Sequence, residues 1–449
     1  MRYTPHTAAD KARMLKTIGL DAVEDLYRHI PKTLTDRAKI DLPDGLTELA
    51  VHQRLAALAS RNATAADWSL FLGGGIYNHF IPSAVDATIS RSEFSTSYTP
   101  YQPEVSQGTL QALFEYQTLI CQLTGMEVSN AAVYDGASAA AEAVLMSRRI
   151  QPAGRRRVLI SNALHPQYRA VVASYVKNLE DVHLEEVAFD ARGATDAEQL
   201  AALLSEESMC VVVGYPNFFG VIEDLAPIKA ACAKAGAQLI TVTTEPLSLG
   251  LLKPPGGFGV DLAVGEGQSL GVPMNLGGPA FGFFACQKKF VRSLPGRLVG
   301  ETVDSEGRRG FVLTLATREQ HIRREKATSN ICTSQTLCAL AATVFMSLLG
   351  KNGLRRLAEV NVARAHAAQA KLVQEAGLIP VFGAPFFNEF VLRSRDVKDM
   401  FQKCAVEKIV PGIALEPWYP ELKDCFLMCV TEMNEREEID RLVRIIAGK

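Results

Sequence analysis

The spacing of apolar residues divides this chain into a helical opening, a long region of alternating strands and helices, and a smaller closing region. Two stretches near the N-terminus, Ala8 to Gly19 and Asp21 to His29, carry apolar residues three and four positions apart, and Pro31 ends the second stretch. That spacing predicts two helices. After a loop-rich part with many Gly, Ser, Thr and aromatic residues, the pattern at 109–124 predicts a further helix.

From Asn130 onward, short apolar runs alternate with helical patterns. The runs predicted to be strands lie at 157–161, 182–188, 209–214, 238–243, 261–265 and 280–286. The helical patterns lie at 136–150, 165–177, 196–204, 223–236, 332–349 and 353–377. This alternation predicts an α/β fold with a mostly parallel sheet that helices cover on both faces. A strand at 425–431 and a last helix at 434–446 predict a small α+β domain at the end.

These patterns predict three parts of the chain. We expect an N-terminal helical segment at 1–62, a large α/β domain at 63–350 and a small C-terminal α+β domain at 351–449.

Composition narrows the class of protein. Hydrophobic residues make up 48% of the 449 residues and charged residues 21%, and the net charge of -2 gives no basic surface for nucleic acid or for an anionic membrane. The longest apolar run, 338–350, is too short for a bilayer, which needs about 20 residues. The N-terminus lacks a secretion or transit pattern, so we expect a cytoplasmic protein. The nine cysteines are scattered and the eight histidines do not fall at ligand spacing, so we expect reduced thiols and no metal site.

The stretch from Pro254 to Gln287 contains no lysine, and this absence is the most informative feature of the sequence for the chemistry of the protein. Its segment Val260-Asp-Leu-Ala-Val-Gly-Glu-Gly-Gln-Ser-Leu-Gly271 resembles the strand and loop that carry the cofactor lysine in pyridoxal-phosphate (PLP) enzymes of the aspartate aminotransferase superfamily, fold type I. Gln268 stands where that lysine belongs. An amide nitrogen has no free lone pair to attack an aldehyde, so it cannot hold the cofactor covalently.

Two neighbouring motifs bear on the same cofactor. Asp135-Gly-Ala-Ser138 opens a helix whose first amides would favour a phosphate, although an ordinary capped helix start has the same features. Members of the superfamily pair the pyridine nitrogen with an Asp at the end of the strand that matches 238–243. Val242 stands at that place, and Glu245 is expected to point elsewhere. Because both the lysine and the Asp are missing, we predict a degenerate PLP site.

A rigid polar loop is a further candidate site. The loop Tyr98-Thr-Pro-Tyr-Gln-Pro-Glu104 follows Arg91-Ser-Glu-Phe94 and combines phenols, prolines and carboxylates. Prolines restrict the backbone, so the polar groups can be held in place, although a loop that only packs its own tyrosines has the same composition. Upstream, Phe71-Leu-Gly-Gly-Gly-Ile-Tyr-Asn-His79 is a glycine-rich turn and is a weak signal by itself.

Together these motifs give a specific resemblance. The chain resembles the alpha subunits (subunit 1) of the two-subunit bacterial glycine dehydrogenases (decarboxylating), the P-proteins of the glycine cleavage system. The resemblance runs nearly from end to end. Besides the loop at 91–104, the matching text is Tyr134-Asp-Gly136, Gly265 to Gly271, Glu325-Lys-Ala-Thr-Ser-Asn-Ile-Cys-Thr333, and the opening Arg2-Tyr-Thr-Pro5 with Met14-Leu-Lys-Thr-Ile-Gly19.

The resemblance implies a division of labour between two homologous chains. The alpha chain shares the fold, whereas a beta chain carries the lysine and holds PLP covalently, and two of each form an α2β2 heterotetramer. The enzyme decarboxylates glycine and passes the aminomethyl group to the lipoyl arm of the H-protein, whose disulfide is reduced, so the reaction is an oxidoreductase step. Decarboxylation leaves electrons that the PLP ring must absorb, which requires the chain with the lysine.

The resemblance also implies that the alpha chain completes the beta chain's active site. Tyr98 and Tyr101 are expected to donate hydrogen bonds toward the glycine carboxylate or the cofactor, and Gln102 and Glu104 are expected to position them. A second set, Thr328, Ser329 and Asn330, is expected to reach the partner's PLP phosphate, unless these residues only cap a helix that begins near residue 332.

Other residues leave two interpretations each. His165 lies where groups that stack on the cofactor occur, but a hydrogen-bonded loop histidine also fits. The arginines 91, 323 and 324 fit either a bound carboxylate or an exposed surface.

Three alternative functions stay open at this point. The chain fits a non-catalytic scaffold or regulatory protein with the PLP fold, although such a protein does not need the tyrosine-rich loop. It also fits an independent PLP enzyme with a displaced lysine, Lys253 or Lys288, or a homodimeric remnant that binds free PLP without a covalent bond.

Overall fold

The computed structural model describes residues 5–38, 41–275 and 277–448, and it forms two compact units, Met1–Ala63 and Thr64–Lys449. Residues 2–4 of the opening motif lie outside the described residues. The first unit contains α1 (Ala8–Thr17), a 3-10 helix (Val23–Tyr27), α2 (Lys32–Thr35) and α3 (Glu48–Ala59).

The helix predicted at 21–29 is wrong in type and length. The structure has only the short 3-10 helix there, and none of its residues is buried. The Asp25 carboxylate accepts hydrogen bonds from the amides of Asp21 and Ala22, which satisfies the first turn locally. Because none of the described residues of this unit is buried, little favours a longer α-helix here. The helix predicted at 8–19 is confirmed as α1.

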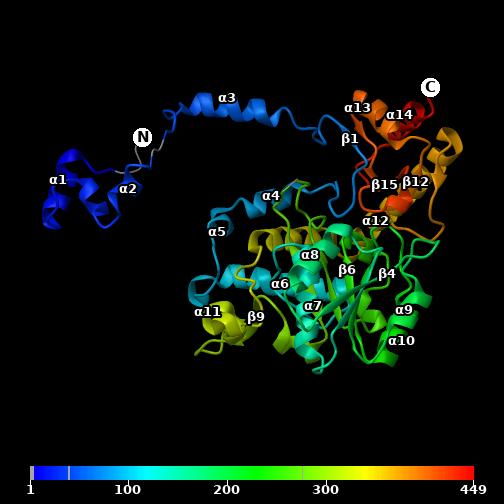
Figure 1. The fold of residues 1–449 in the computed structure, drawn as a ribbon, viewed down its shortest axis with the longest axis horizontal. Coiled ribbons are helices and arrows are strands. Elements are labelled where there is room, and N and C mark those ends of the chain that lie inside the picture. Colours follow the sequence, from blue (N-terminus) through cyan, green and yellow to red (C-terminus); the bar gives the residue numbers. More distant parts are fainter. Residues whose placement is uncertain (1–4, 39–40, 276, 449) are drawn as a thin grey trace. The chain divides into compact units, whose positions relative to one another are not determined.

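A seven-stranded sheet forms the centre of the second unit (Figure 1). Its neighbouring strands, in spatial order, are β2 (Val128–Ser129), β8 (Gly282–Cys286), β7 (Leu262–Glu266), β6 (Gln238–Thr243), β5 (Ser208–Gly214), β3 (Arg157–Ser161) and β4 (His183–Val187). The five strands from β7 to β4 are parallel, and β8 runs antiparallel to β7. The mostly parallel sheet predicted from the alternating pattern is therefore confirmed.

Alternate residues of the strands face two separate apolar layers. On β5 and β6, Val211, Val213 and Leu239 pack in the layer that includes α6 (Gln107–Thr124), α10 (Leu225–Ala235) and the first part of α12 (Thr336–Ala376). On the other face, Val212 and Val242 pack beneath α7 (Gly136–Ile150) and α8 (Pro166–Val176). Because both faces are covered, the strands read as continuous apolar runs in the sequence.

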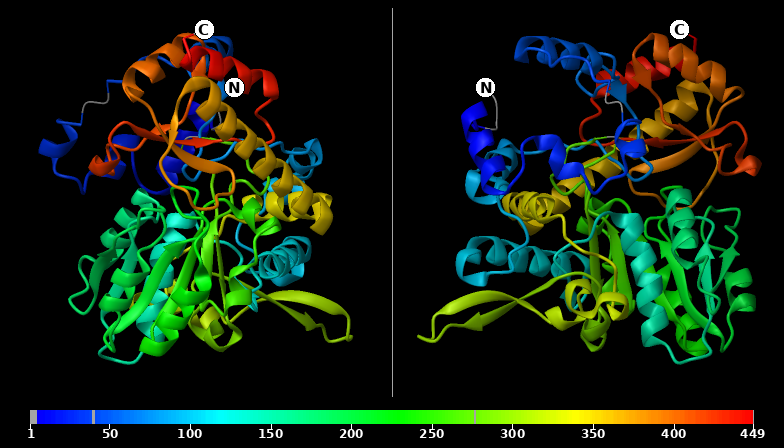
Figure 2. Two further views of the ribbon diagram at one scale, coloured as in Figure 1. Left: turned by 90° about the vertical axis from the view of Figure 1, so that its right-hand side faces the viewer. Right: turned by 60° about the vertical axis from the view of Figure 1, so that its left-hand side comes forward.

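The helix α12 joins the large sheet to a smaller one (Figure 2). Gly350 has a φ of 57°, so α12 is two helices joined at a kink, as the two separate sequence patterns predict. The helix α12 contains a window long and apolar enough to cross a membrane, but a buried core helix has the same composition. Its residues Ala339, Ala341 and Phe345 lie in the core of the large domain.

The remaining elements surround this frame. The small sheet has the order β11 (Ile379–Pro380), β12 (Glu389–Arg393), β15 (Cys425–Cys429) and β14 (Ile413–Ala414), and it packs against α13 (Val397–Val406), α14 (Arg436–Ile446) and the end of α12. Two strand pairs complete the fold: the parallel pair β1 (Ser69–Leu70) and β13 (Ile409–Val410), and the hairpin β9 (Leu298–Val303) and β10 (Arg309–Thr314). Short helices are α4 (Ser83–Ile89), α5 (Ser92–Ser95), α9 (Ala197–Leu203) and α11 (Gln320–Arg323).

Candidate functional site

A cluster of buried polar side chains lies at the carboxyl ends of β6 and β7, where ligands bind in open α/β sheets. Its members are Tyr77, His79, Glu245, Gln268 and Glu389, which we call the polar cluster. Glu245 and Gln268 come from the loops that follow β6 and β7, Tyr77 and His79 come from the glycine-rich segment 71–79, and Glu389 begins β12. Each is at most 7% exposed, so the hydrogen bonds among them decide what this place can hold.

Gln268, which stands in the place of the cofactor lysine, forms side-chain hydrogen bonds within this chain. Its side-chain oxygen accepts a hydrogen bond from the Tyr77 amide at 2.9 Å. Its side-chain nitrogen donates to the Tyr77 carbonyl at 3.1 Å and to the Val272 carbonyl at 2.7 Å. The amide therefore joins the glycine-rich segment to the loop after β7, with its oxygen and both of its N–H donors bonded within the chain.

The start of α7 binds a carboxylate of the same chain. Asp135 caps the helix by accepting from the Ser138 amide at 2.7 Å, and the Gly136 amide donates to the Glu266 carboxylate at 2.9 Å. Glu266 also accepts from the amide of Gln268 at 3.1 Å, and burial raises its pKa to about 7. A Cβ on Gly136 would lie 2.4 Å from the Tyr168 hydroxyl and 2.7 Å from the Glu266 nitrogen. Both the capped-start and the anion-binding interpretations hold in part, because the anion at this helix is Glu266.

His79 bridges two acidic side chains. Its Nε2 lies 2.8 Å from Glu245 and its Nδ1 lies 2.9 Å from Glu432. Burial disfavours the charged imidazolium, but the two carboxylates outweigh burial and raise the pKa of His79 to about 10. Burial likewise disfavours the Glu432 carboxylate, yet its contacts with His79 lower its pKa to about 2. His79 is therefore a cation held between two anions.

The other oxygen of Glu245 and both oxygens of Glu389 are also bonded. Glu245 accepts from the Ser269 hydroxyl at 2.8 Å and from the Leu247 amide at 3.0 Å. Glu389 accepts from the Tyr77 hydroxyl at 2.8 Å and from the Gly74 amide at 2.6 Å, and burial raises its pKa to about 7. These bonds tie the large domain's loops to the first residue of β12.

The remaining residues predicted near a cofactor do not face a ligand. Val242 lies in the apolar layer beneath α7. The His165 ring accepts from the Gln167 amide and bonds the Gly74 carbonyl at 2.7 Å, and burial lowers its pKa to about 4, so the hydrogen-bonded loop histidine is the interpretation that the structure supports.

Among the described residues, neither candidate for a displaced lysine forms a hydrogen bond or ion pair with a member of the polar cluster. Lys253 precedes β7 and its ammonium lies 4.1 Å from the centroid of the Phe258 ring. Lys288 follows β8, which runs antiparallel to β7 and ends beside Leu262. Lys288 therefore lies at the amino end of β7, whereas Gln268 follows its carboxyl end.

The residues at this edge of the sheet do not fit PLP. There is no lysine, a valine stands in place of the ring-nitrogen partner, and the first amide of α7 already donates to Glu266. A phosphate at the start of α7 would have to compete with the carboxylates of Glu266 and Asp135 for the amides of Gly136 and Ser138. We therefore assign no chemical step of this chain to a cofactor of its own.

The predicted tyrosine loop lies at a different place and has the opposite character. Tyr98 is 81% exposed and Tyr101 is 51% exposed, and Gln102 and Glu104 are also exposed. Among the described residues, the side chains of Tyr98, Gln102 and Glu104 make no hydrogen bond within the chain. The Tyr101 hydroxyl, by contrast, accepts a hydrogen bond from Arg297 at 2.9 Å.

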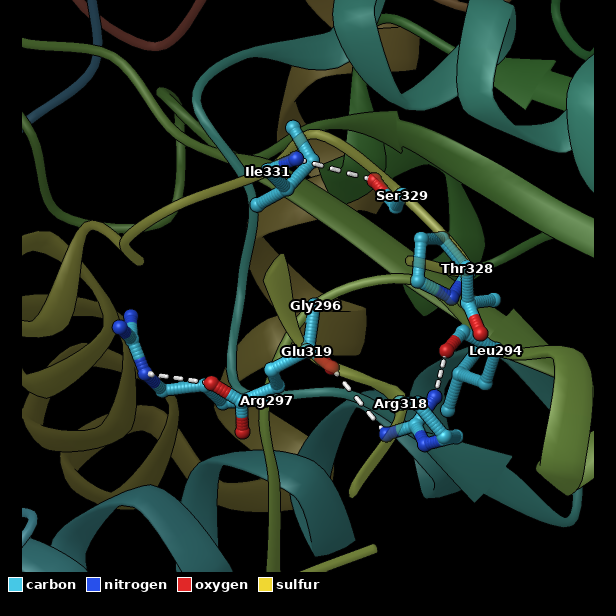
Figure 3. Close-up of a pocket in the computed structure, with 9 residues that line it drawn as sticks. Leu294, Gly296, Arg297, Arg318, Glu319, Thr328, Ser329 and Ile331 are labelled. Atoms are coloured by element: carbon cyan, nitrogen blue, oxygen red, sulfur yellow. Dashed lines mark hydrogen bonds and ion pairs between the residues drawn. The ribbon is translucent and has the colours of Figure 1, made fainter. Parts of the chain in front are cut away.

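The segment with Thr328, Ser329 and Asn330 lies near the same arginine. Arg297 also donates to the carbonyl of Cys332, and the Thr328 and Ser329 side chains line a small pocket together with Arg318 and Glu319 (Figure 3). Asn330 is exposed. The structure thus connects the two predicted sets of site residues through Arg297.

The helix-cap alternative for this segment is wrong. The helix begins at Thr336 rather than near residue 332, and its N-cap residue, Gln335, makes no side-chain capping bond. Instead, Ser329 accepts from the amide of Ile331 at 3.0 Å, which closes a local turn. Among the arginines, Arg91 pairs with Glu93 on the surface at 2.7 Å, whereas Arg323 donates to the Thr317 carbonyl.

Sequence reasoning missed Glu266, Glu389 and Arg297. A carboxylate directly after an apolar strand, as in Ala263-Val-Gly-Glu266, is a signal that could have found the first. The glycine-rich segment 71–79 was a weak signal, yet it supplies Tyr77 and His79 to the polar cluster. Arg297 has no sequence signal, because its role depends on contacts with segments far away in the chain.

Comparison with known proteins assigns the fold first and then the family. The structure superimposes on a sphingosine-1-phosphate lyase from Burkholderia pseudomallei with a TM-score of 0.67 and 16% identity, covering 92% of each chain. At that identity the likeness shows the fold alone. It agrees with the aspartate aminotransferase-like fold type I predicted from the sequence.

Closer matches identify the family. Residues 1–446 match the family model described as "Glycine cleavage system P-protein". A protein from Geobacillus thermodenitrificans with the name "Probable glycine dehydrogenase (decarboxylating) subunit 1" is 49% identical over 443 residues, which cover 98% of each chain. A crystal structure of a glycine decarboxylase (P-protein) of the glycine cleavage system, in inhibitor-bound form, has a TM-score of 0.92 and 45% identity and covers 100% of both chains. This chain therefore belongs to the glycine cleavage system P-protein family.

Proposed function

We propose that this chain is subunit 1, the alpha subunit, of a glycine-decarboxylating P-protein. With a homologous beta subunit it decarboxylates glycine and transfers the aminomethyl group to the lipoyl arm of the H-protein. The observation that carries this proposal is the filled polar cluster in a chain that matches the P-protein family from end to end. A family member that cannot hold the cofactor requires a partner that does.

In this proposal the beta subunit holds PLP covalently, and the cofactor absorbs the electrons released by decarboxylation. The alpha chain contributes polar groups from outside. Tyr98 has a free hydroxyl on a loop stiffened by Pro100 and Pro103, and a phenol can donate to the carboxylate of glycine. Gln102 and Glu104 lie on the same exposed loop, and in this proposal they orient the hydroxyls once the partner is bound. Thr328, Ser329 and Asn330 form the second contribution, toward the phosphate of the partner's PLP.

We expect an α2β2 assembly in the cytoplasm. Symmetric assemblies are the rule for soluble oligomers, and the exposed tyrosine loop fits a subunit interface, where tyrosine is enriched. The first unit supports the same expectation, because it carries exposed apolar side chains at Met14, Ile18, Leu55 and Leu58 and buries none in α1 or α3.

Reconstitution tests the proposal. The chain alone, the beta subunit alone and an equimolar mixture are each supplied with PLP, lipoylated H-protein and carboxyl-labelled glycine, and released carbon dioxide is measured. We expect release only from the mixture. Release from this chain alone would refute the assignment to a helper subunit.

A scaffold or regulatory protein is the alternative, and the same assay separates it. A scaffold would leave the beta subunit active without this chain, and replacement of Tyr98 and Glu104 would have no effect on the rate.

A further inference from the structure

Arg297 is a buried cation that the proposed chemistry does not yet use. It lies just before β9 and is 4% exposed. Its carbonyl accepts from the Ala131 amide at 2.9 Å, so its backbone is fixed to the buried segment that leads into α7. Burying a charge destabilises the fold unless the charge is well paired, so the contacts of Arg297 need an explanation.

The contacts of its guanidinium converge on the two exposed segments of the candidate site. The Nη2 group donates to the Tyr101 hydroxyl at 2.9 Å and to the Cys332 carbonyl. The guanidinium carbon lies 5.3 Å from the centroid of the Tyr101 ring. One planar group thus joins the tyrosine loop to the strip that carries residues 328–330.

The acidic partner of Arg297 is incompletely satisfied. The Nε of Arg297 lies 3.7 Å from Glu319, a distance too long for a hydrogen bond, and Figure 3 shows the two groups facing each other. Within the described residues, neither this Nε nor the Oε1 of Glu319 has a hydrogen-bond partner. The pair is therefore a poor stabiliser of the fold, which favours a role in the site.

The other end of the tyrosine loop has its own anchor. The Gln107 side chain donates to the Pro103 carbonyl at 2.7 Å and to the Phe311 carbonyl at 2.8 Å, and it accepts from the Phe311 amide at 2.9 Å. Gln107 fixes the loop to the β9–β10 hairpin, and Arg297 fixes it to the segment at 332. Tyr98, which precedes both anchors, and Gln102 and Glu104, which lie between them, remain exposed.

We propose that Arg297 is a positioning residue that locks Tyr101 and the 328–332 segment into one rigid surface facing the partner's active site. This inference rests on the proposed function. Because the Tyr101 oxygen accepts from a cation, its hydrogen is directed away from Arg297 and can be donated to a bound carboxylate. Arg297 itself stays behind the surface and touches no substrate.

A double-mutant cycle tests this proposal in the reconstituted complex. Arg297→Lys keeps the charge but loses the planar fork that reaches two acceptors, and Tyr101→Phe removes only the hydroxyl. We expect each single change to lower kcat/KM for glycine by roughly 10- to 100-fold, since small displacements of a positioned group have effects of that size. In the Y101F background, R297K should lower the rate much less than it does alone.

Arg148→Met is the matched control. Arg148 lies on α7 and forms an exposed ion pair with Asp181 at 2.8 Å. It should leave the rate unchanged. The affinity of each variant for the beta subunit is measured by titration, and we expect it to stay within about twofold, since the single hydroxyl and the buried guanidinium contribute little contact area to the interface.

The results separate the two proposals. Equal fold-losses for R297K in the wild-type and Y101F backgrounds would overturn the positioning role, and so would an unchanged rate for Y101F, which needs no stable Arg297 variant. If the wild-type chain fails to activate the beta subunit at all, the proposed function itself is wrong.

Discussion

Two regions of this chain carry polar side chains that a ligand site would need, and they are organised in opposite ways. In the polar cluster, Gln268, His79 and Glu245 are buried and bonded to one another and to the backbone. In the tyrosine loop, the Tyr101 hydroxyl and the Pro103 carbonyl are held by hydrogen bonds, while Tyr98 and Glu104 remain exposed. The first region stabilises the fold, and the second is free to act on something outside the chain. Whether the hydrogen bonds of a polar residue are already satisfied within the chain therefore says more about its function than its position at the edge of a sheet.

The largest effect should come from restoring the missing lysine. Gln268→Lys replaces an amide with three internal hydrogen bonds by an ammonium in a buried place, which should destabilise the chain by roughly 3–5 kcal/mol, the usual range for an unpaired buried charge. Urea denaturation measures the change. Gln111→Lys, on the exposed side of α6, is the control and should stay within about 0.5 kcal/mol of the wild type. A Q268K chain of normal stability that binds PLP would show that the cluster is an open site.

The second largest change in stability should come from the tightly packed start of α7. Gly136→Ala would place a Cβ against the Tyr168 hydroxyl and the Glu266 backbone and should cost about 1–3 kcal/mol, as overpacking does in well-filled cores. Gly108→Ala, in the helix α6, has nothing within 4 Å of its new Cβ and should stabilise the chain by about 0.5–1 kcal/mol. Thermal unfolding of the two variants should therefore shift in opposite directions. Shifts of the same sign would mean that the Glu266–Gly136 contact is loose.

The charge on His79 should make stability depend on pH. Its pKa is about 10 in the folded chain and ordinarily near 6.5, so its contribution is complete below pH 6.5 and is lost as the pH rises toward 10. The free energy of unfolding should fall by at most about 1.4 kcal/mol per pH unit for this one proton. In H79Q this contribution should vanish, whereas the exposed-residue control H183Q should keep it. An identical pH profile for H79Q and the wild type would show that His79 is not a buried cation in the folded chain.

The variant with the smallest expected change in stability should nevertheless lose activity. Tyr98→Phe removes a hydroxyl from an 81% exposed side chain, so stability should change by less than about 0.5 kcal/mol. In the reconstituted complex we expect kcat/KM for glycine to fall by roughly tenfold, the equivalent of one lost hydrogen bond in the transition state. Tyr175→Phe, on α8, is the control. If the Y98F complex kept its full activity, residues 328–330 rather than Tyr98 would be the part of this chain that acts in the partner's site.

The sequence is a good guide to the fold and an incomplete guide to the site. The strands 157–161 and 238–243 and the helix at 136–150 agree with the structure to the residue, because buried strands and an alanine-rich amphipathic helix carry strong periodic signals. The absence of a lysine at Gln268 is also visible in the sequence. What fills the site instead is not visible, because Glu266, His79 and Glu389 meet only after strands and loops far apart in sequence are brought together.

Our central proposal is that the partner subunit holds PLP and that this chain does not. The most direct test is the visible absorption spectrum of the chain alone and with the beta subunit, each incubated with PLP, followed by borohydride reduction and peptide mapping. We predict no cofactor band for the chain alone, and a band with the label on the partner's lysine for the mixture. A yellow chain with the label on one of its own lysines, such as Lys253 or Lys288, would contradict the account and make this chain an enzyme in its own right.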